Sequence, residues 1–180
     1  MRNELRWVTF LIILSLGCKE IKEKLLPSFT VNIPSIKLTI PALPFTQDKE
    51  VPVGALKAHI NMDSTISANT AGAFGAGAVT SVKIKKITFL LQNADAENNL
   101  SNFETGRMRI FSDNDTSATD IAVIHFPQEY TDSLTITPAN SPDISNYLRG
   151  SELSYNIYWK NRRTTGKQLN LLIKVSVNVQ

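Results

Sequence analysis

The alternation of apolar and polar residues constrains the fold more than any other feature of this chain. Within 152–160 and 169–179, apolar side chains recur at almost every second position, and many of them are β-branched. That period fits an extended strand and not the 3.6-residue repeat of a helix. The same pattern predicts further strands over 79–91, with a bulge at Lys85-Lys86, and over 107–111, 120–126 and 133–137.

Prolines interrupt the pattern near the start, where Pro27, Pro34 and Pro41 lie seven residues apart. Prolines at that spacing would break a helix. The apolar alternation shifts by one position at Pro34, so a single flat strand cannot bury both halves. Either Pro34 marks a bend, or the two halves are short strands in different sheets. Proline also suits the edge of a sheet, where its missing donor blocks unwanted pairing.

Three segments depart from plain strand patterns. The segment 58–67 is interpreted as a broken strand or a hairpin, and the glycines of 71–78 as a surface loop, since no Gly-Lys-Ser/Thr and no helix follow them. Ser141, Pro142 and Gly150 have the residue types that begin and end a helix, which predicts one short helix at 142–148. The loop NRRTTGK is expected to join the last two strands as a hairpin.

Eight to ten strands with one small helix and no βαβ alternation predict an all-β fold. We expect an antiparallel β-sandwich, immunoglobulin-like or jelly-roll-like, formed as a single domain over 29–180. The segment 18–28, rich in alternating charges, is expected to be a tether.

Residues 1–17 have the composition of an export signal. Arg2 and Arg6 precede ten largely apolar residues, 7–16, which are too few for a spanning helix of about 20 residues. The stretch then ends in Ser15-Leu16-Gly17-Cys18, and Cys18 is the only cysteine of the chain.

Small residues before a cysteine resemble the lipobox of bacterial lipoproteins, although Ser15 stands where that family often has leucine. The resemblance implies cleavage before Cys18 and its acylation, palmitate included, so that the protein is anchored to a membrane without spanning it. Lys19 then favours the outer membrane, with the domain facing the periplasm or the cell surface. The alternatives are an ordinary secretory signal and an uncleaved anchor. With Cys18 acylated no thiol is left for a disulfide, and about 150 residues can bury enough surface without one.

A second resemblance covers 82–180 and depends on VKIKKITF, NFETGRMRIF, DIAVIHF, DISNYLRG and LLIKVSVNV. These segments resemble the C-terminal part of exported β-sandwich lipoproteins of Gram-negative bacteria with no assigned function. The resemblance implies a fold and a compartment, and no catalytic residues.

No pattern of residues predicts catalysis, a cofactor or nucleic-acid binding. The two histidines, His59 and His125, are far apart in sequence, and neither HExxH nor Gly-x-Ser-x-Gly occurs. Asp113, Asp115 and Asp120 are a weak calcium candidate, because the glycine and glutamate of an EF-hand loop are missing. Without residues 1–17 the chain has 17 basic and 15 acidic residues, a balance too even for a nucleic-acid-binding domain.

The best candidate for a binding surface is the segment 154–167, where aromatic residues precede a cluster of basic ones. On a strand, Tyr155 and Trp159 share one face and Tyr158 lies on the other, so one set is expected in the core. Aromatic rings beside cations can stack on sugars or approach anionic groups. The alternative is a solvated loop that keeps an edge soluble. The candidate ligand-binding residues are Tyr155, Trp159, Lys160, Arg162, Arg163 and Lys167.

These observations favour a lipid-anchored cell-envelope protein that is a structural or protein-interaction module and not an enzyme. Its partners would be the membrane, through acylated Cys18, and another envelope protein or a glycan. A glycan- or lipid-binding module is the first alternative, and a hydrolase is the second.

Overall fold

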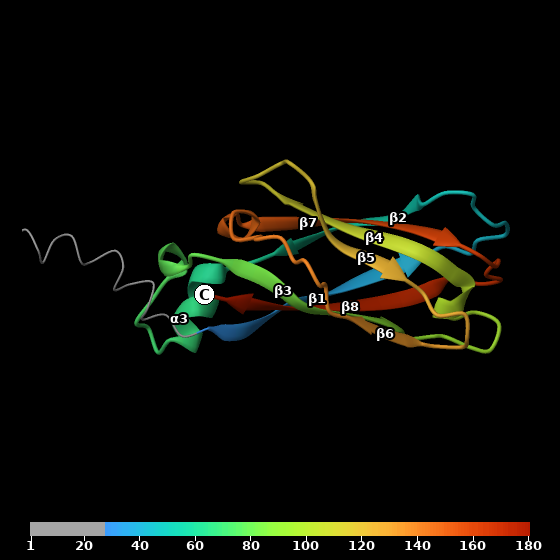
Figure 1. Ribbon diagram of the computed structural model, residues 1–180, viewed down its shortest axis with the longest axis horizontal. Helices are drawn as coiled ribbons and strands as arrows, with labels where there is room; N and C mark the ends of the chain where they lie inside the picture. Colours follow the sequence, from blue (N-terminus) through green and yellow to red (C-terminus); the bar gives the residue numbers. More distant parts are fainter. Residues whose placement is uncertain (1–27) are drawn as a thin grey trace, which may run out of the picture.

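The computed structural model describes residues 28–180, which form two layers of antiparallel strands (Figure 1). The predicted signal peptide 1–17, the acylation site Cys18 and nearly all of the tether 18–28 lie outside the described residues. No helix within 28–180 has the length and apolar character needed to cross a membrane.

Each layer is a sheet of four strands. The first sheet has the order β1-β8-β3-β6 and consists of β1 (Phe29–Ile40), β8 (Leu169–Val179), β3 (Val82–Leu91) and β6 (Ser133–Ile136). The second sheet has the order β2-β7-β4-β5 and consists of β2 (Val51–His59), β7 (Glu152–Asn161), β4 (Phe103–Ser112) and β5 (Thr119–His125).

The pairing of the strands is nested. The first strand pairs with the eighth, the second with the seventh, the third with the sixth and the fourth with the fifth. This is one long hairpin wrapped into two layers, which is the jelly-roll arrangement of eight strands. The constant-type immunoglobulin sandwich instead has seven strands divided four and three. The prediction of an all-β antiparallel sandwich is therefore confirmed, and the strand order selects the jelly roll.

The proline in the first strand marks a bulge. β1 runs through Pro34 as one edge strand, and its register against β8 shifts between Ile33 and Ile36. The extra residue restores the parity that proline had shifted, so both halves of the strand bury their apolar side chains in one core. The bend was thus the correct alternative. The bulge predicted in β3 is also present, between Ile84 and Lys86.

The core lies between the sheets and centres on Trp159. Its ring makes edge-on contacts with Phe103 and Phe126, with centroids 4.5 and 4.8 Å away, and with Phe89 at 6.2 Å. Gly106 leaves the room for it, since a Cβ there would lie 2.5 Å from Trp159 Cδ1. Aromatic residues of this size contribute more buried apolar area than any other side chain of a core.

The helix predicted at 142–148 is a short 3-10 turn, η3 (Tyr147–Arg149). Several of the preceding residues bond to β3. Ser141 Oγ accepts from the Ile84 amide, and the Asp143 carboxylate accepts from the Val82 amide. The residues expected to cap a helix are therefore occupied in extending the first sheet, where the backbones of Lys83 and Asp143 form a bridge.

The described residues contain one α-helix, α3 (Met62–Asn69), in the segment interpreted as a broken strand or hairpin, so that interpretation was wrong. Asn61 caps it by accepting a hydrogen bond from the Ser64 amide at 2.9 Å. Only Met62 and Ile66, one turn apart, are buried, so the helical period was too short to be recognised. The following loop 71–78 includes a 3-10 turn, η1 (Ala76–Ala78), and no helix opens after it, as predicted.

The expected hairpin between β7 and β8 is also wrong, because the two strands belong to different sheets. The loop 162–168 crosses from one layer to the other. Both strands alternate as predicted, but alternation is the same whether two strands lie side by side or one above the other.

Candidate functional site

Two of the predicted ligand-binding residues are core residues. Tyr155 is fully buried and Trp159 is 1% exposed, so neither can contact a ligand at the surface, and this prediction is corrected. Strand alternation had placed them on one face, and that face is the inner one. Burial also raises the pKa of Tyr155. Tyr158 lies on the outer face, where the Arg107 guanidinium sits 5.4 Å from its ring centroid.

The basic residues of the 160–167 loop are used within the protein. Lys160 pairs with Glu104 at 2.9 Å, and Lys167 pairs with Asp95. Arg162 donates to the Phe126 carbonyl at 2.9 Å. Arg163 donates to the Ser101 carbonyl and hydroxyl and to the Gln128 carbonyl. These contacts fasten the loop to its neighbours and leave few donors for a ligand.

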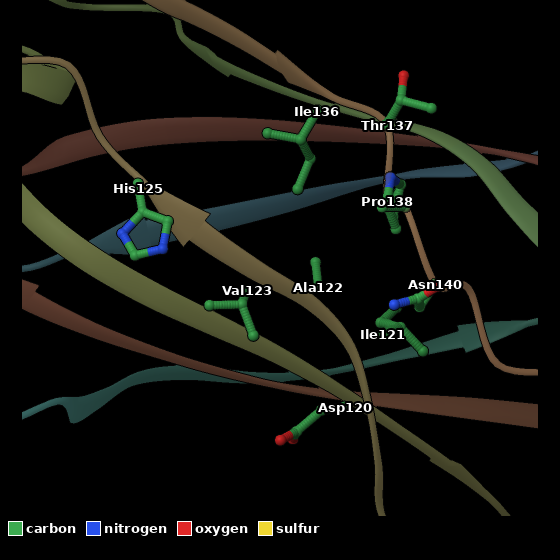
Figure 2. A pocket seen from close by; sticks show the side chains of 10 residues that line it. Asp120, Ile121, Ala122, Val123, His125, Ile136, Thr137, Pro138 and Asn140 are labelled. Carbon is green, nitrogen blue, oxygen red and sulfur yellow. The ribbon is translucent and has the colours of Figure 1, made fainter.

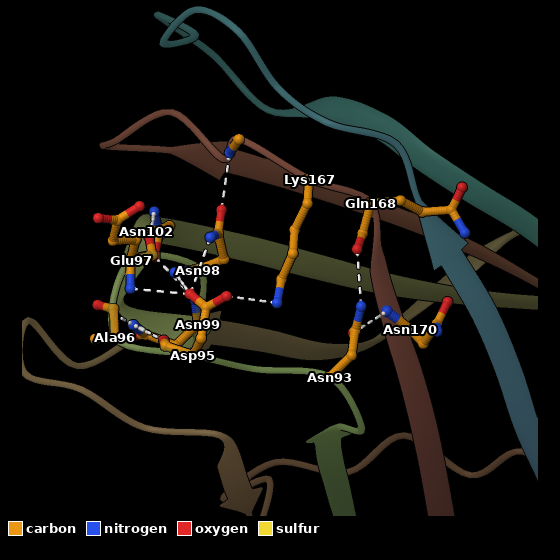
Figure 3. Close-up of polar contacts among 11 residues, drawn as sticks. Asn93, Asp95, Ala96, Glu97, Asn98, Asn99, Asn102, Lys167, Gln168 and Asn170 are labelled. Atoms are coloured by element: carbon orange, nitrogen blue, oxygen red, sulfur yellow. Dashed lines mark hydrogen bonds and ion pairs between the residues drawn. The ribbon is translucent and has the colours of Figure 1, made fainter.

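Beside this loop lies a network of asparagines that the sequence analysis did not single out (Figure 3). Asn98, Asn99 and Asn102 are at most 7% exposed. Asn102 donates to the carbonyls of Glu97 and Thr164, at 2.9 and 2.7 Å, and so ties the 92–102 loop to the 162–168 loop. The run NADAENNLSN, rich in turn-forming Asn and Asp, was the available signal.

Asp95 lies at the centre of that network. Its carboxylate accepts from the Lys167 ammonium and from the side chain and backbone amide of Asn98. The ammonium of Lys167, followed by the Asn98 side chain, holds the pKa of Asp95 well below its ordinary value. The polar groups at this end of the sandwich therefore hydrogen-bond to one another, and we assign them a structural role.

The calcium candidate Asp113, Asp115 and Asp120 does not form a site, because the three carboxylates bind different partners. Asp113 accepts from the Ser151 hydroxyl at 2.7 Å, which lowers its pKa, and Asp115 accepts from the Ser117 amide. Asp120 instead pairs with Arg109 at 2.9 Å. Each carboxylate thus has its own partner. Within 28–180 no three His, Cys, Asp or Glu residues gather where they could hold a metal ion.

The two histidines lie on opposite edge strands of the second sheet. His59 ends β2 opposite Glu152, whereas His125 ends β5 opposite Thr105, which itself pairs with Lys160 at the other end of β7. Two strands separate them, which places their backbones roughly 14 Å apart across the sheet alone. They cannot act on one bond.

A groove of about 490 Å³ opens between β5 and β6, the edge strands of the two sheets (Figure 2). Val123, 64% exposed, and Ile136 give it an apolar lining, and Asp120 and His125 add polar groups at its border. The groove continues past 137–140 into a shallower hollow that reaches Lys83 and Lys85. The sequence offered no signal for it, because its two walls are distant along the chain.

No family model and no curated protein sequence matches the chain. The solved structures to which it is similar include the following three. With the infectious bursal disease virus Gt strain the TM-score is 0.36 and the identity 8%, over 84% of this chain and 32% of the other. With the decameric BFDV capsid protein the values are 0.32 and 9%, over 86% and 100%. With the Drosophila NLP-core they are 0.26 and 11%, over 86% and 97%.

The chain spans about a third of the first of these structures. At such identities and TM-scores the similarity concerns the sandwich fold alone, which the strand order already establishes.

Proposed function

We propose that this protein is a lipid-anchored component of the bacterial cell envelope and acts there as a non-catalytic structural or interaction module. The observation that carries the proposal is Ser15-Leu16-Gly17-Cys18 directly after an apolar run of export-signal length. β1 begins at Phe29, eleven positions after Cys18, so acylation at Cys18 leaves both sheets intact. Lys19 supports the outer membrane as the destination.

The experiment is an intact-mass measurement on the full-length protein released with mild detergent from the membranes of a Gram-negative host. We expect a mass that begins at an acylated Cys18. The Cys18→Ala chain, as control, is expected to lose both the lipid and the cleavage. A wild-type chain that retains residues 1–17 and carries no lipid would contradict the anchor.

The edge strand β5 is the surface that best supports an interaction role. Lys160, Arg162, Arg163 and Lys167 are bound internally, so the 160–167 loop is a weaker candidate. Among the four edges, β1 and β2 contain proline and β6 has four residues, whereas β5 has seven residues, no proline and the exposed Val123. An edge of this kind can add an extended segment of another protein as a further strand.

Crosslinking in intact cells tests this role. We expect the wild-type protein to be captured with another envelope protein. Val123→Lys should lose that product, because a charge replaces the exposed apolar side chain of this edge. Thr39→Lys, on the outer face of β1, is the matched control and should keep it. A wild-type protein that crosslinks to no other protein would contradict the interaction module.

A ligand-binding module is the second candidate, and the groove between β5 and 137–140 favours it. Its apolar floor with polar groups at the border suits a small amphiphilic molecule. We expect Val123→Glu to abolish the retention of such a ligand from envelope extracts. Unchanged retention would exclude this groove.

A further inference from the structure

The outer face of the first sheet carries an unpaired positive charge that the functional assignment above does not use. Its four strands contain five lysines and no Asp or Glu. All five are exposed, and among the described residues none lies in an ion pair. This set, here named the lysine face, consists of Lys37, Lys83, Lys85, Lys86 and Lys174.

The strand register brings the lysines together. Lys86 is opposite Ser176, and Lys37 is opposite Leu172, so Lys174 is a diagonal neighbour of both. Diagonal neighbours in a sheet are about 7–8 Å apart, which makes Lys86, Lys174 and Lys37 a line across β3, β8 and β1. Lys83 and Lys85 extend it along β3, to a patch roughly 20 Å long.

Such an arrangement has an electrostatic cost unless an anionic partner is present. The spacing of the lysines is within the Debye length of about 8–10 Å at moderate salt, so their charges repel one another. Near this face, the acidic residues of the described chain occur only around its margins. Asp132 precedes β6, Asp143 bridges to Lys83 through its backbone and accepts from the amides of Val82 and Ser145, and Asp120 borders the hollow that reaches Lys83. A negatively charged surface would relieve the repulsion of all five lysines at once.

The side chains of the lysine face favour binding to a membrane over binding to a polysaccharide or nucleic acid. The only aromatic residues in these strands are Phe29, whose alternation places it on the inner side, and Phe89, which is fully buried. The face thus offers no ring on which a sugar or a base could stack. Instead, half-buried Leu90 and Leu172 lie opposite each other beside the lysines. Regular strands with scattered ammonium groups suit a broad anionic surface.

The position of the first residues of β1 also favours a membrane as the partner of the lysine face. β1 starts at Phe29 on the edge of this sheet, and the Lys85 ammonium donates to Thr30 Oγ1 at 2.9 Å. The eleven residues from Cys18 to Ser28 are joined by ten peptide links and can span at most about 35 Å. A lipid at Cys18 would keep the lysine face close to the bilayer, and a basic patch strengthens binding by an acyl chain.

We propose that the lysine face docks on an anionic phospholipid surface and so orients the domain with its first sheet toward the membrane. Each lysine that reaches such a surface increases binding by about fivefold. The second sheet, with the β5 edge and its exposed Val123, then remains free for a protein partner.

The test is cosedimentation of the full chain with vesicles of phosphatidylcholine, with and without phosphatidylglycerol. Cys18→Ser in every sample removes acylation, so failure of the proposed anchor cannot affect the result. Residues 1–17, with Arg2 and Arg6, are identical in every sample, so a difference between variants does not come from them. The test variant replaces four members of the lysine face by Gln: Lys83, Lys85, Lys86 and Lys174. The matched control makes the same change in charge elsewhere: Lys49, Lys57, Lys160 and Lys167 to Gln.

We expect the test variant to lose roughly tenfold or more of the binding that depends on phosphatidylglycerol, and the control to change by less than about threefold. Higher salt should also weaken the binding of the wild type to the phosphatidylglycerol vesicles. Equal losses in both variants would show a mere net-charge effect and overturn the proposal. So would the absence of any dependence on phosphatidylglycerol, or a preference for a soluble anionic polysaccharide. Melting temperatures of both variants well above the assay temperature exclude unfolding as the cause.

Discussion

The outer faces of the two sheets treat positive charge in opposite ways. The second sheet has four basic residues, and each pairs with an acid: Lys57 with Glu152, Arg107 with Glu50, Arg109 with Asp120 and Lys160 with Glu104. The first sheet has five lysines and none is paired among the residues described. The near-neutral charge of the whole chain therefore conceals a basic face.

If the outer faces bind partners, the core that the two sheets share should provide most of the stability. Trp159→Ala tests this with the largest effect. It removes the ring that contacts Phe89, Phe103 and Phe126, and we expect the free energy of unfolding to fall by about 3–5 kcal/mol. The control Tyr158→Ala, on the outer side of the same strand, should cost about 1 kcal/mol or less. Denaturant unfolding measures both, and equal losses would refute this expectation.

The polar end of the molecule should behave as structure rather than as a ligand site. Asn102→Ala leaves the carbonyls of Glu97 and Thr164 without their donor, and we expect a loss of about 2–3 kcal/mol. Asn140→Ala, at an exposed position beside the groove, should be nearly neutral. A neutral Asn102→Ala would reopen a binding role for the loop next to Lys160 and Lys167.

Asp95 gives this end a dependence on pH. Its pKa in the folded protein is below the ordinary value of about 3.9, so the stabilisation is present above about pH 4 and is lost as the pH falls through the folded pKa. Asp95→Asn should therefore be less stable than the wild type at neutral pH, and the difference should shrink below pH 4. Thermal melting across this range checks the sign. A difference that grows in acid would contradict it.

The smallest expected changes in stability come from replacing one lysine of each sheet. Lys57→Gln breaks the pair with Glu152 and should lower stability by about 0–1 kcal/mol, because the Lys57 side chain is 70% exposed. Lys86→Gln relieves repulsion and should raise stability by a few tenths of a kcal/mol at low salt, a gain that high salt removes. If both changes have the same sign and salt dependence, the contrast between the faces is wrong.

Much of the fold was predictable because alternation is a local property. Most strand positions, the sandwich class and the bulge at Lys85-Lys86 follow from residues close together in sequence. At Pro34 the shift of alternation was visible, but whether it marked a bend or a change of sheet was not. What alternation does not encode is which strands are neighbours. The hairpin expected for β7 and β8 failed for this reason, since stacked and adjacent strands show the same pattern.

The candidate site was less predictable, and the reason is again non-local. Tyr155 and Trp159 shared a face, but nothing nearby indicated that this face was the buried one. The lysine face depends on β8 lying between β1 and β3, which joins Lys37, Lys86 and Lys174 from three distant segments. Only the nested pairing reveals it.

The most direct test of the account is lysine labelling of the protein in native membranes, followed by mass spectrometry and compared with detergent-released protein. We predict that Lys83, Lys85, Lys86 and Lys174 are protected in the membrane and become reactive on release, while Lys49 and Lys57 react equally in both states. Equal reactivity of the two groups in the membrane would contradict a domain held with its first sheet against the bilayer.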